Sequence, residues 1–321
     1  MVAIGYTLMG EQSGAKQLVA DAVRAEEVGF DFLAASDHYF PWLEAQGHSP
    51  YTWSVLGAVA HATEHVELMT YVTCPTMRYH PAVVAQKAAT IQLLSDGRFT
   101  LGLGAGERLN EHVTGRPWPA TDVRHEMLVE AIDIITELFA GHTVTYRGEH
   151  LSTEHARLWD LPDRPPAIGV AASGSRSCEI AARHDALIAV QPDADLVEHF
   201  ENAGGQGKPV VGQVPVSYDA NTDVAVKRAV EQFRWSVGGW PVMAELPGPS
   251  NFAAASDTVR DEDVTQQIPC GADVEAHVSA VKKFADAGFT EIALVQIGGD
   301  AQDTFFDWAR AELLPELRKL G

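Results

Sequence analysis

The feature that most constrains this fold is the repeated exchange of short apolar runs with longer amphipathic segments over 321 residues. The runs are hydrophobic on both faces, which is typical of buried parallel strands. We expect strands at residues 2–8, 31–36, 66–73, 98–104, 166–173, 186–191, 209–217 and 291–297. We expect helices at residues 14–28, 54–65, 123–139, 175–184, 222–235, 272–288 and 304–320, with another beginning at residue 81.

Eight such strands in one chain favour an α/β fold of the closed (β/α)₈ TIM-barrel type over an open doubly wound sheet. No linker or composition shift divides the sequence, so we expect a single domain over residues 1–321. Residues 41–51, 106–121 and 240–271 form insertions after strands two, four and seven. These insertions lie at the C-terminal face of the strands, where barrel enzymes carry their active sites. The excursion at residues 141–165 predicts a small hairpin beside the barrel.

Composition narrows the set of partners. With 44 acidic and 23 basic residues the net charge is −21, so the surface repels nucleic acid and anionic membranes. The three cysteines do not resemble a disulfide framework, which indicates a reducing compartment. We find no secretion signal or membrane span and therefore expect a cytoplasmic protein. The scattered histidines lack metal-binding spacing, so we expect no metal site.

The first candidate cluster follows the second strand. Asp37 and His38 are adjacent there and should project in different directions, as separate contacts to one ligand. His38, with an ordinary pKa of about 6.5, suits proton transfer at neutral pH. Trp42 could wall an aromatic or sugar-sized ligand. The alternative is a loop histidine capped by Asp37, with Trp42 in the core.

The second cluster is a glycine run after the fourth strand, at Gly102, Gly104 and Gly106. Its spacing departs from that of a dinucleotide-binding loop, so a Rossmann interpretation is disfavoured. Small residues here would let a flat ligand lie against the backbone. Glu107 would then stand beside that ligand, with a raised pKa, as a general acid. The alternative is a helix-initial glutamate that faces the helix dipole.

Three further patterns complete the survey. Ser173, Gly174, Ser175 and Arg176 open a helix after the fifth strand and form either a phosphate cradle or an ordinary capped turn. Cys74 has no activating base nearby in the sequence, so a nucleophilic role is disfavoured. The sequence also lacks the Gly-x-Ser-x-Gly elbow of α/β hydrolases.

Together these segments resemble the luciferase-like monooxygenase superfamily, in the branch that uses the deazaflavin coenzyme F420. Within that branch they resemble the F420-dependent glucose-6-phosphate dehydrogenases. The resemblance spans most of the chain and is weakest between residues 193 and 271. The matched residues are Ser36-Asp37-His38, Pro41-Trp42, Thr76, Arg78-Tyr79, residues 81–86, Gly104, Gly106-Glu107, residues 109–111, Thr114-Gly115, Ala171-Ala172 and Gly174.

The resemblance implies a role for each matched position. His38 would be the base that takes the substrate hydroxyl proton, Glu107 the acid serving the cofactor ring, and Trp42 a wall of the substrate site. It also implies a non-prolyl cis peptide bond behind the ring, at Tyr71-Val72. The residues implied to bind coenzyme F420 are Asp37, Tyr71, Val72, Thr73, Gly106, Glu107, Asn110, Ala171, Ala172, Ser173, Gly174 and Ser175. Relatives of this kind are usually homodimers, so a homodimer is implied as well.

The sequence departs from the resemblance where the glucose-6-phosphate enzymes clamp the sugar phosphate with cations. Residues 190–195 carry Asp193 and Asp195, and the insertion at 240–271 offers only Arg260 among several carboxylates. Such a lining would hold a phosphate poorly. We therefore expect a neutral small-molecule substrate: an alcohol, a carbonyl compound or a non-phosphorylated sugar. The alternatives are a flavin-dependent monooxygenase using FMN, a glucose-6-phosphate dehydrogenase proper, and a non-catalytic barrel that carries the deazaflavin.

Overall fold

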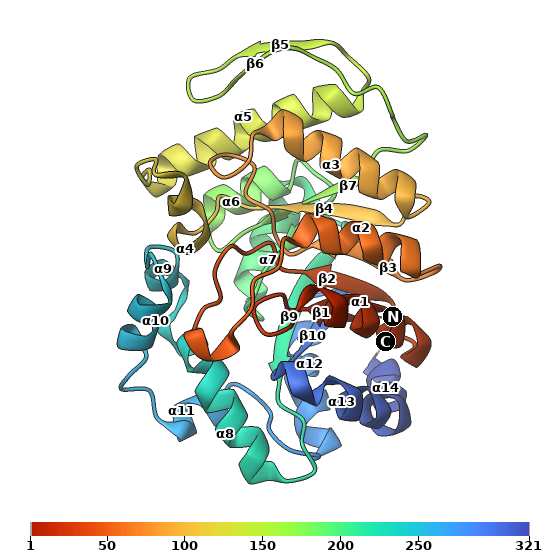
Figure 1. Cartoon of the computed structure of the whole chain (residues 1–321), viewed down its shortest axis with the longest axis vertical. Coiled ribbons are helices and arrows are strands. Elements are labelled where there is room, and N and C mark those ends of the chain that lie inside the picture. The colour runs from red at the N-terminus through yellow and green to blue at the C-terminus, as the bar shows by residue number, and fades with distance from the viewer. Residues whose placement is uncertain (1, 321) are drawn as a thin grey trace.

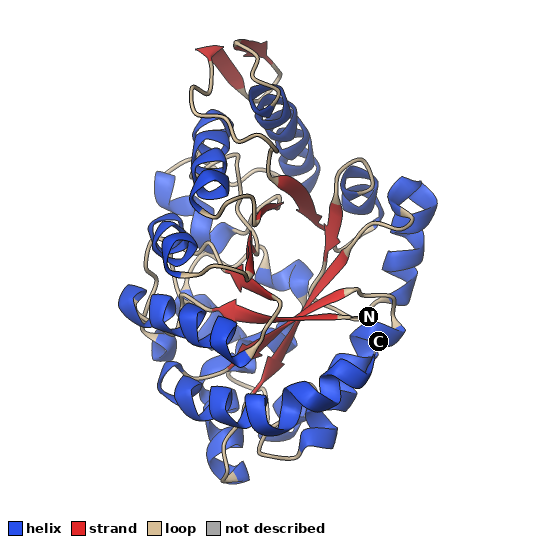
Figure 2. Ribbon diagram, turned by 90° about the vertical axis from the view of Figure 1, so that its right-hand side faces the viewer, coloured by secondary structure: helices blue, strands red, loops and turns tan. Residues whose placement is uncertain are grey.

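The computed structural model describes residues 2–320, and within that range eight parallel strands close into a barrel with helices around it (Figures 1 and 2). The order around the barrel is β1-β10-β9-β8-β7-β4-β3-β2, which confirms the predicted (β/α)₈ fold. The strands are β1 (Ala3–Leu8), β2 (Phe32–Ala35), β3 (Glu67–Thr70), β4 (Phe99–Leu103), β7 (Ala167–Ala171), β8 (Ala186–Ile188), β9 (Val210–Val216) and β10 (Glu291–Gln296). Met1 and Gly321, both included in the predicted domain, lie outside the described residues.

Strand β2 illustrates why the strands are hydrophobic on both faces. Phe32 and Ala34 belong to a cluster with residues of β3, β8, β9 and β10 that fills the barrel. Leu33 and Ala35 belong to the larger core between the strands and the surrounding helices. Because side chains alternate along a strand, a barrel strand must be apolar at every position rather than at every second one.

The helices occupy the predicted segments, with additions. They are α1 (Ala15–Val28), α2 (Thr52–Ala62), α3 (Pro81–Leu94), α4 (Arg108–Glu111), α5 (Thr121–Phe139), α6 (Ser175–Ala181), α7 (Ala194–Phe200), α8 (Thr222–Phe233), α9 (Trp240–Met243), α10 (Pro249–Ala255), α11 (Asp261–Thr265), α12 (Val274–Asp286), α13 (Gln302–Trp308) and α14 (Leu314–Leu317). Helix α1 ends at Gly29 with φ 101°, as its C-terminal glycine predicts.

The expected final helix over 304–320 is confirmed, and it includes a π-helical turn at Ala309–Leu313 between α13 and α14. Pro315 lies at the start of α14, and proline supplies no N–H and crowds the carbonyl of the preceding turn. Helix α7 was not expected; its signal is Asp193, whose carboxylate accepts the backbone N–H of Leu196.

The predicted hairpin is confirmed as β5 (Val144–Arg147) and β6 (Ser152–Ala156), which pair antiparallel and project beyond α5 (Figure 1). The carboxylate of Glu130 on α5 accepts the backbone N–H groups of Glu149, His150 and Leu151. This carboxylate ties the turn of the hairpin to the barrel.

The loops at the carboxyl ends of the strands pack into a second hydrophobic cluster, here named the mouth cluster. It joins the ends of β1 and β10, the loop after β2, α4, α8 and the insertion after β9. Its buried members are Met9, Trp42, Leu43, Leu109, Ala229, Phe233, Met243, Phe252, Val264, Ile268, Val295 and Ile297. Within residues 2–320, no helix is both long and apolar enough to cross a membrane.

Candidate active site

His38 lies between two carboxylates at the carboxyl ends of the strands. Its Nδ1 is 3.1 Å from Oε1 of Glu11, and its Nε2 is 3.0 Å from Oε1 of Glu107. Glu11 follows β1, His38 follows β2, and Glu107 follows β4 at the N-cap of α4. The barrel therefore brings three loops that are distant in sequence to one point. We call Glu11, His38 and Glu107 the acid–base row, with His38 at its centre.

The two carboxylates set the charge of the imidazole. Burial favours the neutral form of His38, but the charges of Glu11 and Glu107 outweigh burial and raise its pKa to about 9. Burial would also raise the pKa of Glu107, but His38 and Asn110 together lower it below its usual value. The expectation of a raised pKa for Glu107 was therefore wrong for this arrangement, because the residue faces a cation and a hydrogen-bond donor.

Glu11 was not among the site residues predicted from the sequence. Its carboxylate is buried and accepts a hydrogen bond from the Ser36 hydroxyl at 2.6 Å, while its backbone oxygen accepts the N–H of His48. The available signal was its position, three residues after the first strand and on the face where barrel enzymes carry their sites.

Asn110 connects the two loops that carry His38 and Glu107. Its side-chain oxygen accepts the backbone N–H groups of Tyr39 and Phe40, at 2.7 and 3.2 Å. Its amide nitrogen donates to Oε1 of Glu107. Asn110 thus fixes the spacing of the pair, and its contact with a cofactor ring remains a prediction.

Asp37 points away from His38, as expected of adjacent residues at a strand end. Its carboxylate is buried and accepts hydrogen bonds from Trp53, Thr73, Arg78 and Tyr79. This hydrogen-bonded hub of Asp37, Trp53, Thr73, Arg78 and Tyr79 holds the start of the His38 loop in place. Asp37 and Thr73 are two of the predicted cofactor-binding residues. Whether either residue also contacts a cofactor remains a prediction.

Glu111 extends the hub on the other side of Arg78. One of its oxygens accepts the backbone N–H of Arg78 at 2.7 Å, and the other lies 3.5 Å from Nε of the guanidinium. Burial raises the pKa of Glu111 to about 7, against the opposing effect of Arg78. Arg78 therefore stands between two buried carboxylates.

Trp42 is buried beside His38 as a member of the mouth cluster, and its role as a wall of the substrate site remains a prediction. Its ring centre is 4.7 Å from that of His38, and its other neighbours are Trp235, stacked at 4.0 Å and 10°, and Phe252, edge-on at 5.1 Å. Trp235 and Phe252 lie in the segment after β9, and neither was among the residues predicted for the site. They were missed because only the folded barrel brings that segment over the loop after β2.

The loop after β3 has the backbone feature that the resemblance implied, since the Tyr71-Val72 peptide bond is cis. The hydroxyl of Tyr71 donates to the backbone oxygen of Ala189. A Cβ atom at Gly102 would lie 2.0 Å from the Thr70 carbonyl oxygen, and one at Gly104 would lie 2.7 Å from Val72. The expectation that Gly102 and Gly104 make room for a ligand was wrong, because both are buried against β3 and the loop that follows it.

Gly106 adopts a φ of +82°, and its Cα faces the Cys74 sulfur. Burial raises the pKa of the Cys74 thiol above its usual range, which agrees with the absence of a nucleophilic role in the sequence interpretation. Contact of Gly106 with a cofactor remains a prediction.

The predicted phosphate cradle lies at the exposed start of α6, after Ala171 and Ala172. No atom lies within 4 Å of the space that a Cβ at Gly174 would occupy. The Ser173 N–H donates to Ser177, and Ser175 is exposed on the first turn of the helix. Backbone N–H groups at an accessible helix start fit an anionic group. Arg176 lies 3.3 Å from both Asp122 and Glu126.

The arginine considered for a substrate phosphate is held elsewhere. Arg260 is exposed and binds Asp263 at 2.7 Å on its own helix, α11. Asp193 caps α7, as described above. These positions give no support to a sugar-phosphate clamp.

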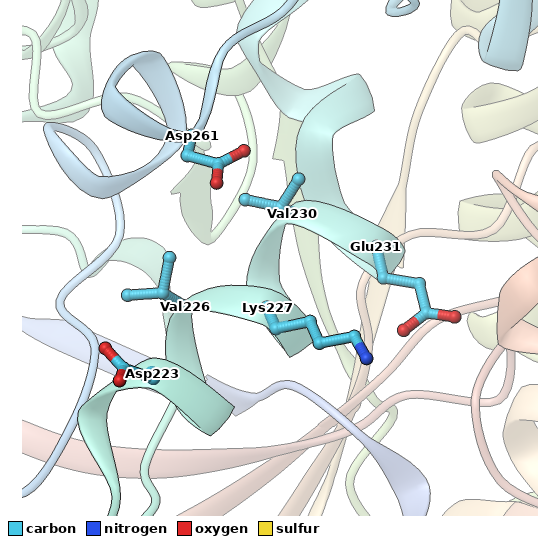
Figure 3. Close-up of a pocket in the computed structure, with 6 residues that line it drawn as sticks. All are labelled: Asp223, Val226, Lys227, Val230, Glu231 and Asp261. Atoms are coloured by element: carbon cyan, nitrogen blue, oxygen red, sulfur yellow. The ribbon is translucent and has the colours of Figure 1, made fainter.

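A surface groove elsewhere shares no residue with this constellation. It lies between α8 and α11, and Figure 3 shows its lining by Asp223, Val226, Lys227, Val230, Glu231 and Asp261. Its charged members Asp223, Lys227 and Glu231 are exposed. Within residues 2–320, no group of three potential metal ligands is found. The site around His38 is therefore the stronger candidate for chemistry.

An α/β barrel with a buried acid–base row at its strand ends belongs to the class of barrel enzymes. The family model of the luciferase-like monooxygenases matches residues 2–291, and the chain belongs to this family, as its motifs predicted. It is 36% identical, over 98% of its length and 88% of the relative, to the F420-dependent hydroxymycolic acid dehydrogenase of Mycobacterium tuberculosis. It is 34% identical, over the full length of both chains, to the F420-dependent glucose-6-phosphate dehydrogenase of Amycolatopsis mediterranei.

The fold is also shared with a solved structure of an F420-dependent secondary alcohol dehydrogenase in complex with an F420–acetone adduct. The two structures superpose with a TM-score of 0.90 at 27% identity, covering 99% of each chain.

Proposed function

We propose that this chain is an F420-dependent oxidoreductase that transfers a hydride between coenzyme F420 and a neutral alcohol, carbonyl compound or non-phosphorylated sugar. The observation that carries the proposal is the row Glu11–His38–Glu107 beside Trp42 at the strand ends. Relatives over nearly the whole chain act with F420, which supports the choice of cofactor.

The residues present fit this cofactor. The start of α6, where Ser173, Gly174 and Ser175 are exposed, would hold its phosphate. The loop at Tyr71-Val72-Thr73 would lie behind the ring, and Gly106, Glu107 and Asn110 would border it. When bound, F420 supplies the carbon that accepts or gives the hydride, so the protein needs to supply proton handling and orientation.

His38 and Glu107 can handle that proton as a pair. In the contact described above the proton resides on His38, whose pKa is about 9. When His38 loses this proton, its neutral imidazole can take the proton of a substrate hydroxyl at Nε2, and in the reverse direction protonated His38 can give a proton to a carbonyl oxygen. Glu11 then orients His38 through Nδ1 while Nε2 faces the hydroxyl, which is the arrangement of a general base. Glu107 would serve the cofactor ring, as the resemblance implies, and stabilises the charged form of His38.

The preference for a neutral substrate follows from charge. Two arginines that could offset the charge of a phosphate are already bound to carboxylates: Arg78 to Asp37 and Glu111, and Arg260 to Asp263. A phosphate would face Glu11 and Glu107 without a free cation from these residues to offset the repulsion. An FMN-dependent monooxygenase and a glucose-6-phosphate dehydrogenase proper are the alternative functions.

The experiment begins with the apoprotein, mixed separately with F420 and FMN while ligand fluorescence is recorded. Neutral alcohols, sugars and glucose 6-phosphate are then compared by the loss of oxidised F420 absorbance. We expect F420 binding, and turnover with neutral substrates. Turnover of glucose 6-phosphate as fast as that of the best neutral compound would reject the substrate class, and oxygen-dependent turnover with FMN would favour the monooxygenase.

Variants at the two titrating residues test the mechanism. His38→Ala and Glu107→Ala should each lower turnover by about 10²–10⁴-fold. Binding of F420 should change little, since neither change touches the proposed phosphate cradle. Near-normal turnover in both variants would remove these residues from the mechanism.

We also propose a homodimer, a cytoplasmic location and a single domain over residues 1–321. The free cysteines Cys74, Cys178 and Cys270 support a reducing compartment. Light scattering on the eluted protein should give twice the chain mass of 34.7 kDa. A mass equal to that of one chain would reject the dimer.

A further inference from the structure

A buried arginine ties the insertion after β9 to the start of α5. Glu245, just after α9, accepts hydrogen bonds at 3.0 Å from both terminal nitrogens of Arg124. It also accepts a bond from Nε1 of Trp118 at 2.9 Å. The guanidinium lies over the Trp118 ring, 4.3 Å from its centre. Two charge-assisted bonds with a stacked arginine make a geometrically specific contact.

A second tether fixes the same short segment to the active-site loop. The backbone N–H of Arg108 donates to the carbonyl oxygen of Ala244 at 2.9 Å. Arg108 directly follows Glu107, and Figure 1 places α9 beside α4. Residues 244 and 245 are therefore bound on one side to the loop of Glu107 and on the other side to α5.

The insertion held in this way supplies part of the wall over His38. Met243 and Phe252 belong to the mouth cluster together with Trp42, and Phe252 contacts the Trp42 ring edge-on. Trp235, which lies just before this insertion, stacks on the Trp42 ring. A displacement of residues 244–245 would shift these aromatic side chains relative to His38.

We propose that Glu245 and Arg124 are positioning residues, and that their contact with Trp118 is a clasp that holds the insertion closed over the His38 site. Neither residue touches His38 or Glu107, so they act through the position of the insertion. The expected effect on substrate binding rests on the proposed function, because the proposed function places the substrate beside Trp42.

Glu245→Gln is the sharpest test, because it removes the charge, keeps the shape and changes a side chain that is half exposed. Arg124 keeps its bonds to Pro119 and Thr121, so the variant should fold. Asp263→Asn is the matched control, since it breaks an exposed ion pair in the same insertion. Arg124→Lys is a second variant that keeps the charge and loses the pair of N–H groups that reach Oε1 of Glu245.

We expect Glu245→Gln to raise the KM of the best neutral alcohol by about tenfold, the loss typical of a charged hydrogen bond. Its kcat and F420 dissociation constant should change by less than about threefold, because no group in the acid–base row is altered. Backbone amides of residues 240–248 should exchange hydrogen for deuterium faster in the free protein. Arg124→Lys should give intermediate values, and Asp263→Asn should match the wild type.

Equal KM values and exchange rates for Glu245→Gln and Asp263→Asn would overturn the proposal. A fall in kcat with unchanged exchange at 240–248 would also overturn it, because the insertion would then still be held in place and the effect would arise elsewhere. Failure of the wild type to bind or reduce F420 would reject the proposed function instead. The exchange comparison needs no cofactor, and it still decides whether the clasp holds the insertion.

Discussion

Replacing Glu11 by glutamine tests how the charge of His38 is set. Two unit charges 3.1 Å apart attract by about 5 kcal/mol at an effective dielectric constant of about 20, before the cost of burial is counted. An opposite charge this close typically shifts a pKa by about 1–3 units. With Glu107 still in place, Glu11→Gln should therefore lower the His38 pKa from about 9 to about 6–8.

The assay is an NMR titration of ¹⁵N-labelled imidazoles, with the His38 signal assigned by its loss in His38→Gln. Glu64→Gln is the control, because Glu64 lies 3.9 Å from His65 on the exposed surface and should not affect His38. If F420 turnover is present, the pH limb of kcat/KM assigned to His38 should move by the same amount. A His38 midpoint within about 0.5 unit of the wild-type value would refute the reasoning.

Three other outcomes follow from the structure. The pKa of His38 is about 9 in the folded protein and about 6.5 in the unfolded chain, so protonation of His38 stabilises the fold fully below pH 6.5. As the pH rises from about 6.5 through about 9, the free energy of unfolding should fall by up to about 3 kcal/mol. A His38→Gln variant with the same pH profile of stability as the wild type would contradict this. Arg78→Met leaves two buried carboxylates without their cation and should cost about 3–5 kcal/mol in urea unfolding, whereas a loss below about 1 kcal/mol would contradict the buried pairing. Gly102→Ala places a Cβ 2.0 Å from the Thr70 carbonyl oxygen and should lower the free energy of unfolding by about 1–3 kcal/mol. Gly174→Ala is the control, because a Cβ there would stand in open space and should hardly change stability. Equal thermal midpoints of the two variants would show that β3 can move aside.

Much of the fold could be predicted from local pattern. A barrel strand is buried on both faces, so its sequence is apolar at each position, as Phe32, Leu33, Ala34 and Ala35 illustrate. Proline and glycine also act locally, which is why the C-terminal end of α1 at Gly29 was predictable. The π-helical turn before Pro315 carried the same kind of signal, but it was not predicted because the surrounding residues keep a helical pattern.

The sequence by itself determined the barrel and the face on which His38, Trp42 and Glu107 lie, because strand ends follow from chain order. Only the tertiary structure placed His38 between Glu11 and Glu107, and only it brought Trp235 and Glu245 over the barrel mouth. The physical reason is that the charge of a buried imidazole depends on burial and on carboxylates from other loops. Those distances are set by closure of the barrel, which no local stretch of sequence encodes.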